Sequence, residues 1–295
     1  MKKAMVYLQM MRPANVITSV ADVLAGTAIA GIFLHGSLVP HLHAVILLCL
    51  STACLYSGGI IFNDVFDADL DKVERPERAI PSGKISLQNA ILFGSIFLVA
   101  GIILAGVVSP VSGSLAAAIS FLALLYNKIS KHHFFFGPLN MGFCRGLNLL
   151  LGISVLTDKL PAWYFLAVVP VVYIFSITMI SRGEVHGGSK RNLYIAAILY
   201  SIVTGFILWF SYLNNKLLLS AIILIPFLWM IFKPLFKAIQ NPVGKNIGSA
   251  VKAGVISLIL MDAAWSATFG TIYSALLIVC LLPISLWLAK IFAVT

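Results

Sequence analysis

Apolar stretches that are long enough to cross a membrane recur along almost the whole chain. A helix of about 20 residues spans the hydrocarbon core of a bilayer. Ten stretches approach this length: 14–34, 42–62, 87–108, 110–127, 137–156, 161–181, 192–213, 216–236, 247–269 and 271–291. Their apolar residues are continuous, whereas the strands of a membrane barrel alternate and are about ten residues long. The pattern predicts an all-α, multi-pass transmembrane helical bundle of nine to ten helices, since little more than Gly270 separates the last two stretches.

The composition excludes a soluble protein. Of 295 residues, 60% are hydrophobic and only 10% are charged. A soluble chain of this length has too little polar surface to cover so much apolar material. We therefore expect one integral-membrane domain over 1–295, surrounded by membrane lipids.

The net charge of +10 is explained by topology. If the N-terminus lies in the cytoplasm and the stretches cross in turn, the cytoplasmic side receives all of the 20 Lys and Arg residues except Lys159 and Lys216. This is the distribution that the positive-inside rule describes. We expect cytoplasmic termini, the cytoplasmic or inner membrane in a bacterium, and no nucleic-acid partner.

Four of the ten acidic residues lie within 63–71, at the edge of the second apolar stretch. If the second helix continues through residue 71, then Asn63, Asp64, Asp67 and Asp71 share an arc of about 100° and Asp69 faces the other way. Like charges at these spacings repel, so a partner is needed. Mg²⁺, held by carboxylates and substrate phosphates, is one such partner. A solvated loop with charges of both signs is the plainer alternative.

These residues resemble a known family. Asn63-Asp64-x-x-Asp67-x-x-x-Asp71, followed by 75–85 (RPERAIPSGKI), is similar to the first signature of the UbiA family of intramembrane prenyltransferases. Other segments agree in order: 12–15 (RPAN), Tyr126 with Lys131, and 137–148 (GPLNMGFCRGLN). The resemblance covers nearly the whole chain.

The resemblance implies a central cavity open to the cytoplasmic side, with cytoplasmic active-site loops. Mg²⁺ would join a polyprenyl diphosphate to Asn63, Asp64, Asp67 and Asp71, and a small hydrophobic acceptor, usually aromatic, would capture the prenyl carbon. Lys and Arg side chains donate charge-assisted hydrogen bonds to phosphate oxygens. The candidates are Arg78, Lys131 and Arg145, with Lys128 and Lys190 as weaker ones. Each is also explained as an ordinary positive-inside residue.

The second acidic signature of the family is mostly absent. The corresponding stretch is 181–190 (SRGEVHGGSK), in which only Glu184 is acidic. This form resembles the EboC-like branch of the family. Glu184 and His186 can hold a metal together, or His186 can act as a base on the acceptor. Alternatively, Glu184 pairs with Arg182 or Lys190, and His186 faces water.

Polar residues inside the apolar stretches are further candidates, because charge at the centre of a bilayer is costly. Asn15 matches the opening segment of the family, and Asn148 belongs to its fifth-helix segment. Asp22 lies deeper, where it can face the acceptor, whereas Asp262 fits a structural contact between helices. Tyr126 can offer its phenol to diphosphate or its ring to a carbocation.

Two functions remain open. The first is Mg²⁺-dependent prenyl transfer, with Asp67, Lys131, Glu184 and His186 as catalytic residues. The second is a UbiA-like binding or transport protein that keeps the diphosphate and Mg²⁺ site without turnover. The intact first signature favours the enzyme, and the reduced second signature favours the alternative. The acceptor, the prenyl length and the oligomeric state stay open.

Overall fold

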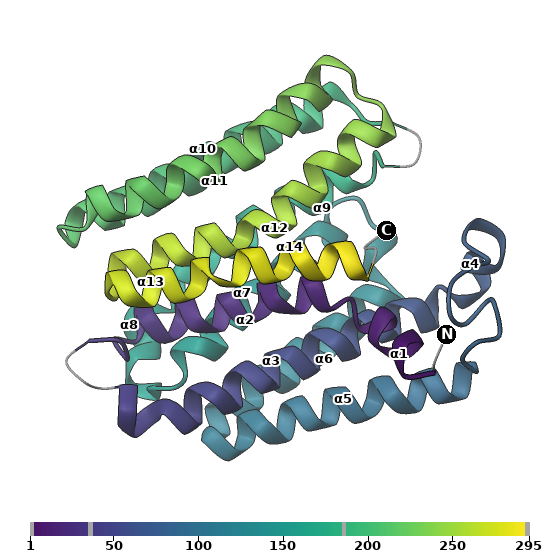
Figure 1. The fold of residues 1–295 in the computed structure, drawn as a ribbon, viewed down its shortest axis with the longest axis horizontal. Coiled ribbons are helices and arrows are strands. Elements are labelled where there is room, and N and C mark those ends of the chain that lie inside the picture. The colour runs from purple at the N-terminus through teal and green to yellow at the C-terminus, as the bar shows by residue number, and fades with distance from the viewer. Residues whose placement is uncertain (1–2, 35–37, 185–186, 293–295) are drawn as a thin grey trace.

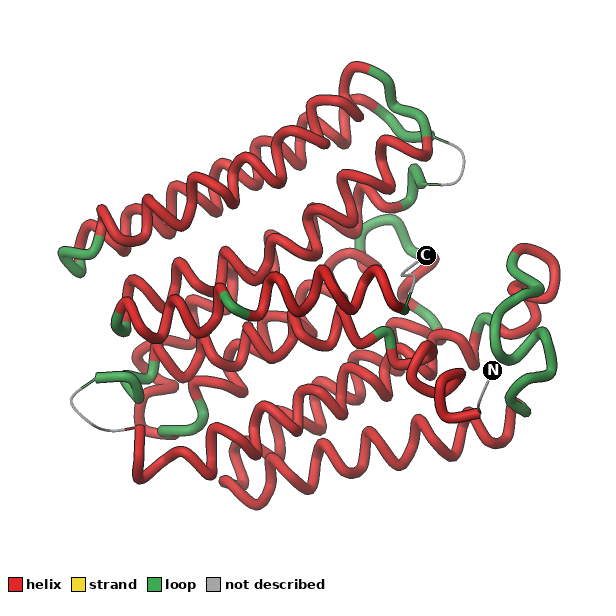
Figure 2. Tube along the Cα trace, in the orientation of Figure 1, coloured by secondary structure: helices red, strands yellow, loops and turns green. Residues whose placement is uncertain are grey.

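The chain folds into a bundle of long, roughly parallel and antiparallel helices (Figure 1). A computed structural model describes residues 3–34, 38–184 and 187–292. The longer helices are α2 (Pro13–Ile29), α3 (Leu38–Phe66), α5 (Leu87–Val108), α6 (Pro110–Lys128), α7 (Phe136–Ile153), α9 (Val168–Ser181), α10 (Lys190–Leu213), α11 (Leu217–Gln240) and α12 (Gly244–Phe269). The shorter ones are α1 (Lys3–Met11), α4 (Ala68–Glu74), η1 (Ser130–His132), η2 (Thr157–Lys159), α8 (Leu160–Trp163), η3 (Tyr164–Ala167), α13 (Ile272–Val279) and α14 (Leu281–Ile291). No strand occurs in the described ranges (Figure 2).

The predicted all-α membrane bundle is confirmed, and each of the ten apolar stretches contains helix. By length and composition, 8 helices in the described part of the chain can cross a membrane, counting 157–181 and 272–291 as one each. Two further segments run along the bundle: α2, which is shorter, and α7, which carries polar residues. Some predicted ends were wrong. The first stretch leaves the helix at Ile29, and the sixth contains 3-10 turns before α9 begins.

Helix α12 lies in the middle of the bundle, where it packs against α2, α9, α10 and α11 (Figure 1). Helix α2 packs beside α12 and crosses α7 at two glycines. A Cβ atom on Gly26 would lie 2.8 Å from the Cα of Gly152, and one on Gly152 would lie 2.3 Å from the carbonyl oxygen of Val23. Small residues permit this close approach between membrane helices. The crossing brings the polar residues of α2 and α7 together.

One end of the bundle gathers α1, α4 and both described ends of the chain (Figure 1). The turn η1 belongs to the same end, because its Lys131 forms an ion pair with Asp67. Phe292 shares a cavity there with Val6 and Met10 of α1, which fits an even number of crossings. Arg12 separates α1 from α2 and has a left-handed backbone, with φ at 48°. Such a conformation is uncommon outside glycine. It turns the chain sharply, so that α2 begins at Pro13 and the Arg12 side chain reaches the end of α3.

Candidate active site

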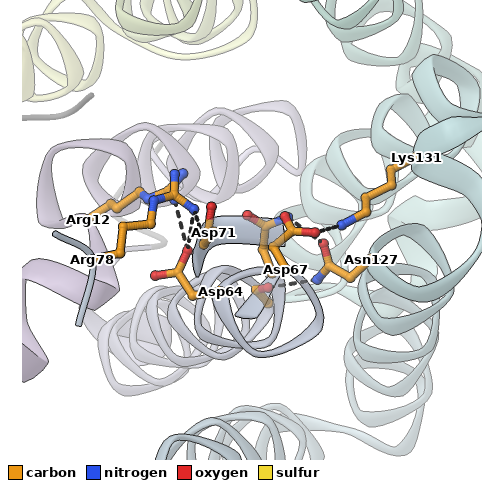
Figure 3. A network of polar contacts seen from close by, with 9 residues as sticks. Arg12, Asp64, Asp67, Asp71, Arg78, Asn127 and Lys131 are labelled. Atoms are coloured by element: carbon orange, nitrogen blue, oxygen red, sulfur yellow. Dashed lines mark hydrogen bonds and ion pairs between the residues drawn. The ribbon is translucent and has the colours of Figure 1, made fainter. Parts of the chain in front are cut away.

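The acidic stretch lies where α3 breaks. The second helix does not continue unbroken through residue 71, since α3 ends at Phe66 and α4 begins at Ala68. The backbone hydrogen bonds nevertheless continue, because the Asp67 N–H donates to Asn63 and the Asp71 N–H donates to Asp67. The break at Asp67 divides the four predicted oxygen donors into two groups with different partners (Figure 3).

The first group is Asp64 with Asp71, and two arginines hold it together. Arg78 donates to Asp71 at 2.8 Å and to Asp64 at 3.3 Å, and Arg12 donates to Asp64 at 3.1 Å. The Asp71 side chain is only 5% exposed. Figure 3 shows both guanidinium groups on the same side of the carboxylates. Arg12, Asp64, Asp71 and Arg78 therefore form a charge-paired cluster at the membrane edge.

The second group is Asp67 with Asn63, which faces the end of α6. Lys131, in η1, forms an ion pair with Asp67. Asn127 accepts a hydrogen bond from Asn63 at 3.2 Å and donates to the carbonyl of Gly59 at 2.9 Å. Lys131 is itself anchored, because Arg182 at the end of α9 donates to its carbonyl oxygen at 3.1 Å. Asp67 thus connects α3 to the segment that joins α6 and α7.

Asp69 lies away from both groups, as its helical position predicts. Its side chain is 94% exposed and accepts a hydrogen bond from Lys72 at 2.7 Å. That hydrogen bond and the charge of Lys72 lower the pKa of the Asp69 carboxyl. Asp69 is therefore a surface carboxylate two residues from Asp67 that takes no part in the buried ion pairs.

A cavity of about 280 Å³ begins beside these groups and runs between α2, α3, α6 and α7. Its polar end is lined by Arg12, Asn15, Asn63, Tyr126 and Asn127, and its middle by Leu55, Ile60, Ile119, Ala123 and Met141. The lining residues of α3 extend from Thr52 to Asn63, about 16 Å along a helix axis at 1.5 Å per residue. The cavity therefore leads from the charged edge well into the membrane-spanning part of the bundle.

The inner end of the cavity is polar again. Arg145 and Asn148 of α7 line it together with Thr52 and Tyr56 of α3. Asn148 accepts a hydrogen bond from Thr52 at 2.6 Å, and the Arg145 guanidinium lies over the Tyr56 ring at 5.0 Å. Asp22 does not line the cavity. It accepts hydrogen bonds from Arg145 at 2.6 Å and from Asn148 at 2.8 Å, so it holds the residues that do.

The stretch in place of the second acidic signature is described only in part. His186 lies outside the described residues. Glu184 is exposed, yet partial burial of its carboxyl raises its pKa, which nearby Arg75 lowers in part. Arg182 donates to the carbonyls of Lys131 and His133. Lys128 and Lys190 are exposed and do not line the cavity.

The oxygen donors fit a hard divalent cation. Asn63, Asp64, Asp67 and Asp71 offer only oxygen atoms as ligands, the atoms that Mg²⁺ takes. Among the described residues, no group of three or more His, Cys, Asp or Glu side chains is arranged to hold a metal alone. Mg²⁺ is commonly held by one or two carboxylates together with substrate phosphates. The arrangement thus suits a cation that arrives with a phosphorylated substrate.

Several residues that shape the site were missed by sequence reasoning as site residues. Arg12, Asn127 and Arg182 bind the acidic groups or the segment that carries Lys131. In the sequence, Arg12 and Arg182 look like ordinary positive-inside residues. Only their positions beside the family signatures distinguish them from the other basic residues. The amide of Asn127 at the end of an apolar helix, one residue after Tyr126, was a signal that could have been used.

The helical bundle and its acidic site are of the kind expected for an intramembrane prenyltransferase. The model of the UbiA prenyltransferase family matches residues 24–238, so the chain belongs to this family. The nearer resemblance to the EboC-like branch stays a prediction.

Two similar proteins carry the same name. The digeranylgeranylglyceryl phosphate synthase of Methanothrix thermoacetophila is 33% identical over 149 residues, which are 50% of this chain and 54% of that protein. The protein of the same name from Sulfurisphaera tokodaii is 27% identical over 239 residues, 74% of this chain and 83% of that protein. The match thus spans about half the length of several of these relatives.

Solved structures share the fold. A structure described as a digeranylgeranylglyceryl phosphate synthase in membranes superposes with a TM-score of 0.65 at 21% identity, covering 92% of this chain and all of that one. A UbiA homolog from Archaeoglobus fulgidus bound to DMAPP and Mg²⁺ gives a TM-score of 0.65 at 14% identity, covering 89% of this chain and 98% of that one. These likenesses establish the architecture of the bundle.

Proposed function

We propose that this protein transfers a prenyl group from a polyprenyl diphosphate to an acceptor, with Mg²⁺ as cofactor. The observation that carries the proposal is the cavity of about 280 Å³, which runs from Arg12 and Asn63 at the membrane edge along apolar side chains into the bundle. A prenyl diphosphate has a matching polarity, with a charged head and a hydrocarbon tail. The homolog from Archaeoglobus fulgidus, bound to DMAPP and Mg²⁺, supports the assignment.

The basic residues of the site suit a diphosphate leaving group. Arg12, Arg78 and Lys131 already lie within ion-pair distance of Asp64, Asp71 and Asp67, so each can serve phosphate oxygens beside these carboxylates. Their positive charges stabilise the negative charge that develops as the C–O bond of the donor breaks. Mg²⁺, when bound, adds charge neutralisation at the same oxygens. Asn63 adds its amide oxygen to the carboxylate ligands of the cation, and Asn127 orients the Asn63 amide by accepting its hydrogen bond.

The aromatic rings along the cavity suit the carbon of the C–O bond that breaks. Breaking the C–O bond leaves positive charge on the allylic carbon. Tyr126 lines the polar end of the cavity, next to Asn63 and Asn127. An aromatic face attracts a cation within about 6 Å. The Tyr126 ring is therefore placed to stabilise the carbon before the acceptor captures it.

The names of the relatives favour a glyceryl phosphate acceptor over the aromatic one that the family resemblance implied. A second cavity of about 260 Å³ supports this choice. It lies on the other side of Arg12 and is also lined by Asp64, Arg78 and Lys84. Arg12, Arg78 and Lys84 bring three cationic hydrogen-bond donors to this cavity, the kind of donors that bind a phosphate group. We infer that the acceptor carries its phosphate here, close to the donor diphosphate.

The test is to incubate the purified protein with Mg²⁺, labelled geranylgeranyl diphosphate and geranylgeranylglyceryl phosphate. We expect diphosphate release and a labelled product of higher mass, both lost in Asp67→Asn. Asp69→Asn is the matched control, because it removes a carboxylate that is exposed and outside the ion-paired groups. Tight, Mg²⁺-dependent diphosphate binding without release, for any acceptor, would instead favour the binding or transport protein.

Orientation is a separate part of the proposal. We infer that the charged end of the bundle faces the cytoplasm, since it carries α1, α4 and the segments with most basic residues. Cysteine labelling of intact cells tests this. Lys159→Cys should react with an impermeant reagent, and Lys72→Cys should react only after the cells are opened. The reverse pattern would refute the orientation without touching the proposed activity.

A further inference from the structure

Three ionisable side chains meet behind the inner end of the cavity, one from each of three helices. Asp22 lies on α2, Arg145 on α7 and Asp262 on α12. The guanidinium of Arg145 donates to Asp22 at 2.6 Å and to Thr18 at 2.6 Å. The Asp262 carboxyl lies within hydrogen-bonding reach of Asp22, where α12 packs against α2. Asp22 and Asp262 are 0% and 1% exposed, so both carboxyls are sealed from water.

The charges of this group do not balance if both carboxyls are ionised. Two carboxylates and one guanidinium leave a net negative charge about 14 Å from the start of α2, counted at 1.5 Å per residue. An uncompensated charge in such surroundings is expensive, and two adjacent carboxylates cannot both ionise easily. The oxygens show the same deficit, because neither Asp22 Oδ1 nor Asp262 Oδ2 has a hydrogen-bond partner among the described residues.

One proton resolves both deficits. A carboxylic acid donates a hydrogen bond, whereas a carboxylate only accepts one. A proton held between the two carboxyls makes the group neutral and supplies the donor for a hydrogen bond between Asp22 and Asp262. Arg145 keeps its charge in any surroundings, so the proton belongs to the carboxyl pair.

We propose that Asp22 and Asp262 share this proton, and that Asp262 acts as a positioning residue for Arg145 in the cavity wall. Asp262 fixes Asp22, and Asp22 fixes the guanidinium that lines the cavity beside Tyr56. Arg145 donates to two protein oxygens and has five N–H groups in all, which leaves donors for a substrate. Because the ion pair is neutral, the inner end of the cavity suits an uncharged oxygen or an apolar chain better than a phosphate.

The first experiment observes the proton directly and requires no turnover. The infrared spectrum of the purified protein at neutral pH should contain the C=O stretch of a protonated carboxylic acid, on the high-frequency side of the amide I band. Asp262→Asn should remove this band, and Asp69→Asn should leave it unchanged. A wild-type spectrum without the band, or a band that survives both Asp262→Asn and Asp22→Asn, would overturn the proposal.

The second experiment measures positioning and rests on the proposed prenyl transfer. Asn keeps a donor at position 262 without a charge, so Asp262→Asn should retain the KM for prenyl diphosphate within about threefold. Asp262→Leu removes the donor and should raise that KM about tenfold or more, the cost of a lost hydrogen bond to a charged group. Equal KM values for the two variants would refute the positioning role. A protein without turnover would still show or lack the infrared band, so the two failures are distinguishable.

Discussion

The crossing of α2 and α7 makes a prediction whose size follows from the geometry. In Gly152→Ala, the new methyl carbon would lie 2.3 Å from the Val23 carbonyl oxygen and 2.9 Å from the Cα of Gly26. Ordinary contact begins at 3.4 Å, so the two helices must separate by roughly 1 Å. Both contacts are backbone atoms, which cannot rotate away. Overpacking of this kind costs about 1–3 kcal/mol.

Gly205→Ala supplies a control of the opposite sign. Gly205 lies in α10, and a Cβ atom there would meet nothing within 4 Å. Alanine is favoured over glycine in a helix by about 1 kcal/mol, so this variant should be slightly more stable than the wild type. Reversible unfolding in mixed micelles, followed by circular dichroism, measures both free energies. If Gly152→Ala were as stable as Gly205→Ala, the close contact between α2 and α7 would be refuted.

Three other predictions concern the charged end. The pKa of the Glu184 carboxyl is raised in the folded chain, so the folded chain keeps the carboxyl proton to a higher pH than the unfolded chain does. The free energy of unfolding should therefore fall as pH rises through the folded pKa, and Glu184→Gln should flatten that fall in unfolding experiments. Asn127→Ala frees the amide of Asn63 and should raise the Mg²⁺ concentration for half-maximal diphosphate release about tenfold, measured by metal titration. Arg182→Gln removes the donor to the Lys131 carbonyl and should raise the KM for prenyl diphosphate with little change in melting temperature; unchanged kinetics would show that the Lys131 segment is held by other contacts.

The fold was predictable because membrane helices leave a strong sequence signal. Each crossing needs a long apolar run, and every run was found. The ends were harder, since turns at the membrane surface contain the same apolar residues as the helices. The first run continues to 34, but α2 ends at Ile29, and nothing in the hydropathy marks that point. The break of α3 at Asp67 was missed because helical spacing continues on both sides of it.

The site was predictable where it consists of neighbours in sequence. The exclusion of Asp69 follows from helical spacing, and the structure places it accordingly. The division of the other four residues into two groups does not follow from that spacing. Partners from distant segments cannot be recognised from the spacing of residues in the sequence. Arg12 pairs with Asp64 across 52 residues, and Arg145 pairs with Asp22 across 123. Asp22 was expected to face the acceptor, but its contact with Arg145 depends on how α2 and α7 cross.

The cavity is built entirely from the first half of the chain, since its lining residues all lie between Arg12 and Asn148. The helices after α7 support these walls from behind without forming their surface. The protein is therefore modular in a way that chimeras can exploit. Replacing α10 and α11 with the corresponding helices of another family member should preserve the preferred prenyl length, whereas replacing α3 or α6 should change it. Within α12, Asp262 is the position that a graft would have to keep, because it reaches through to the wall that the substrate meets.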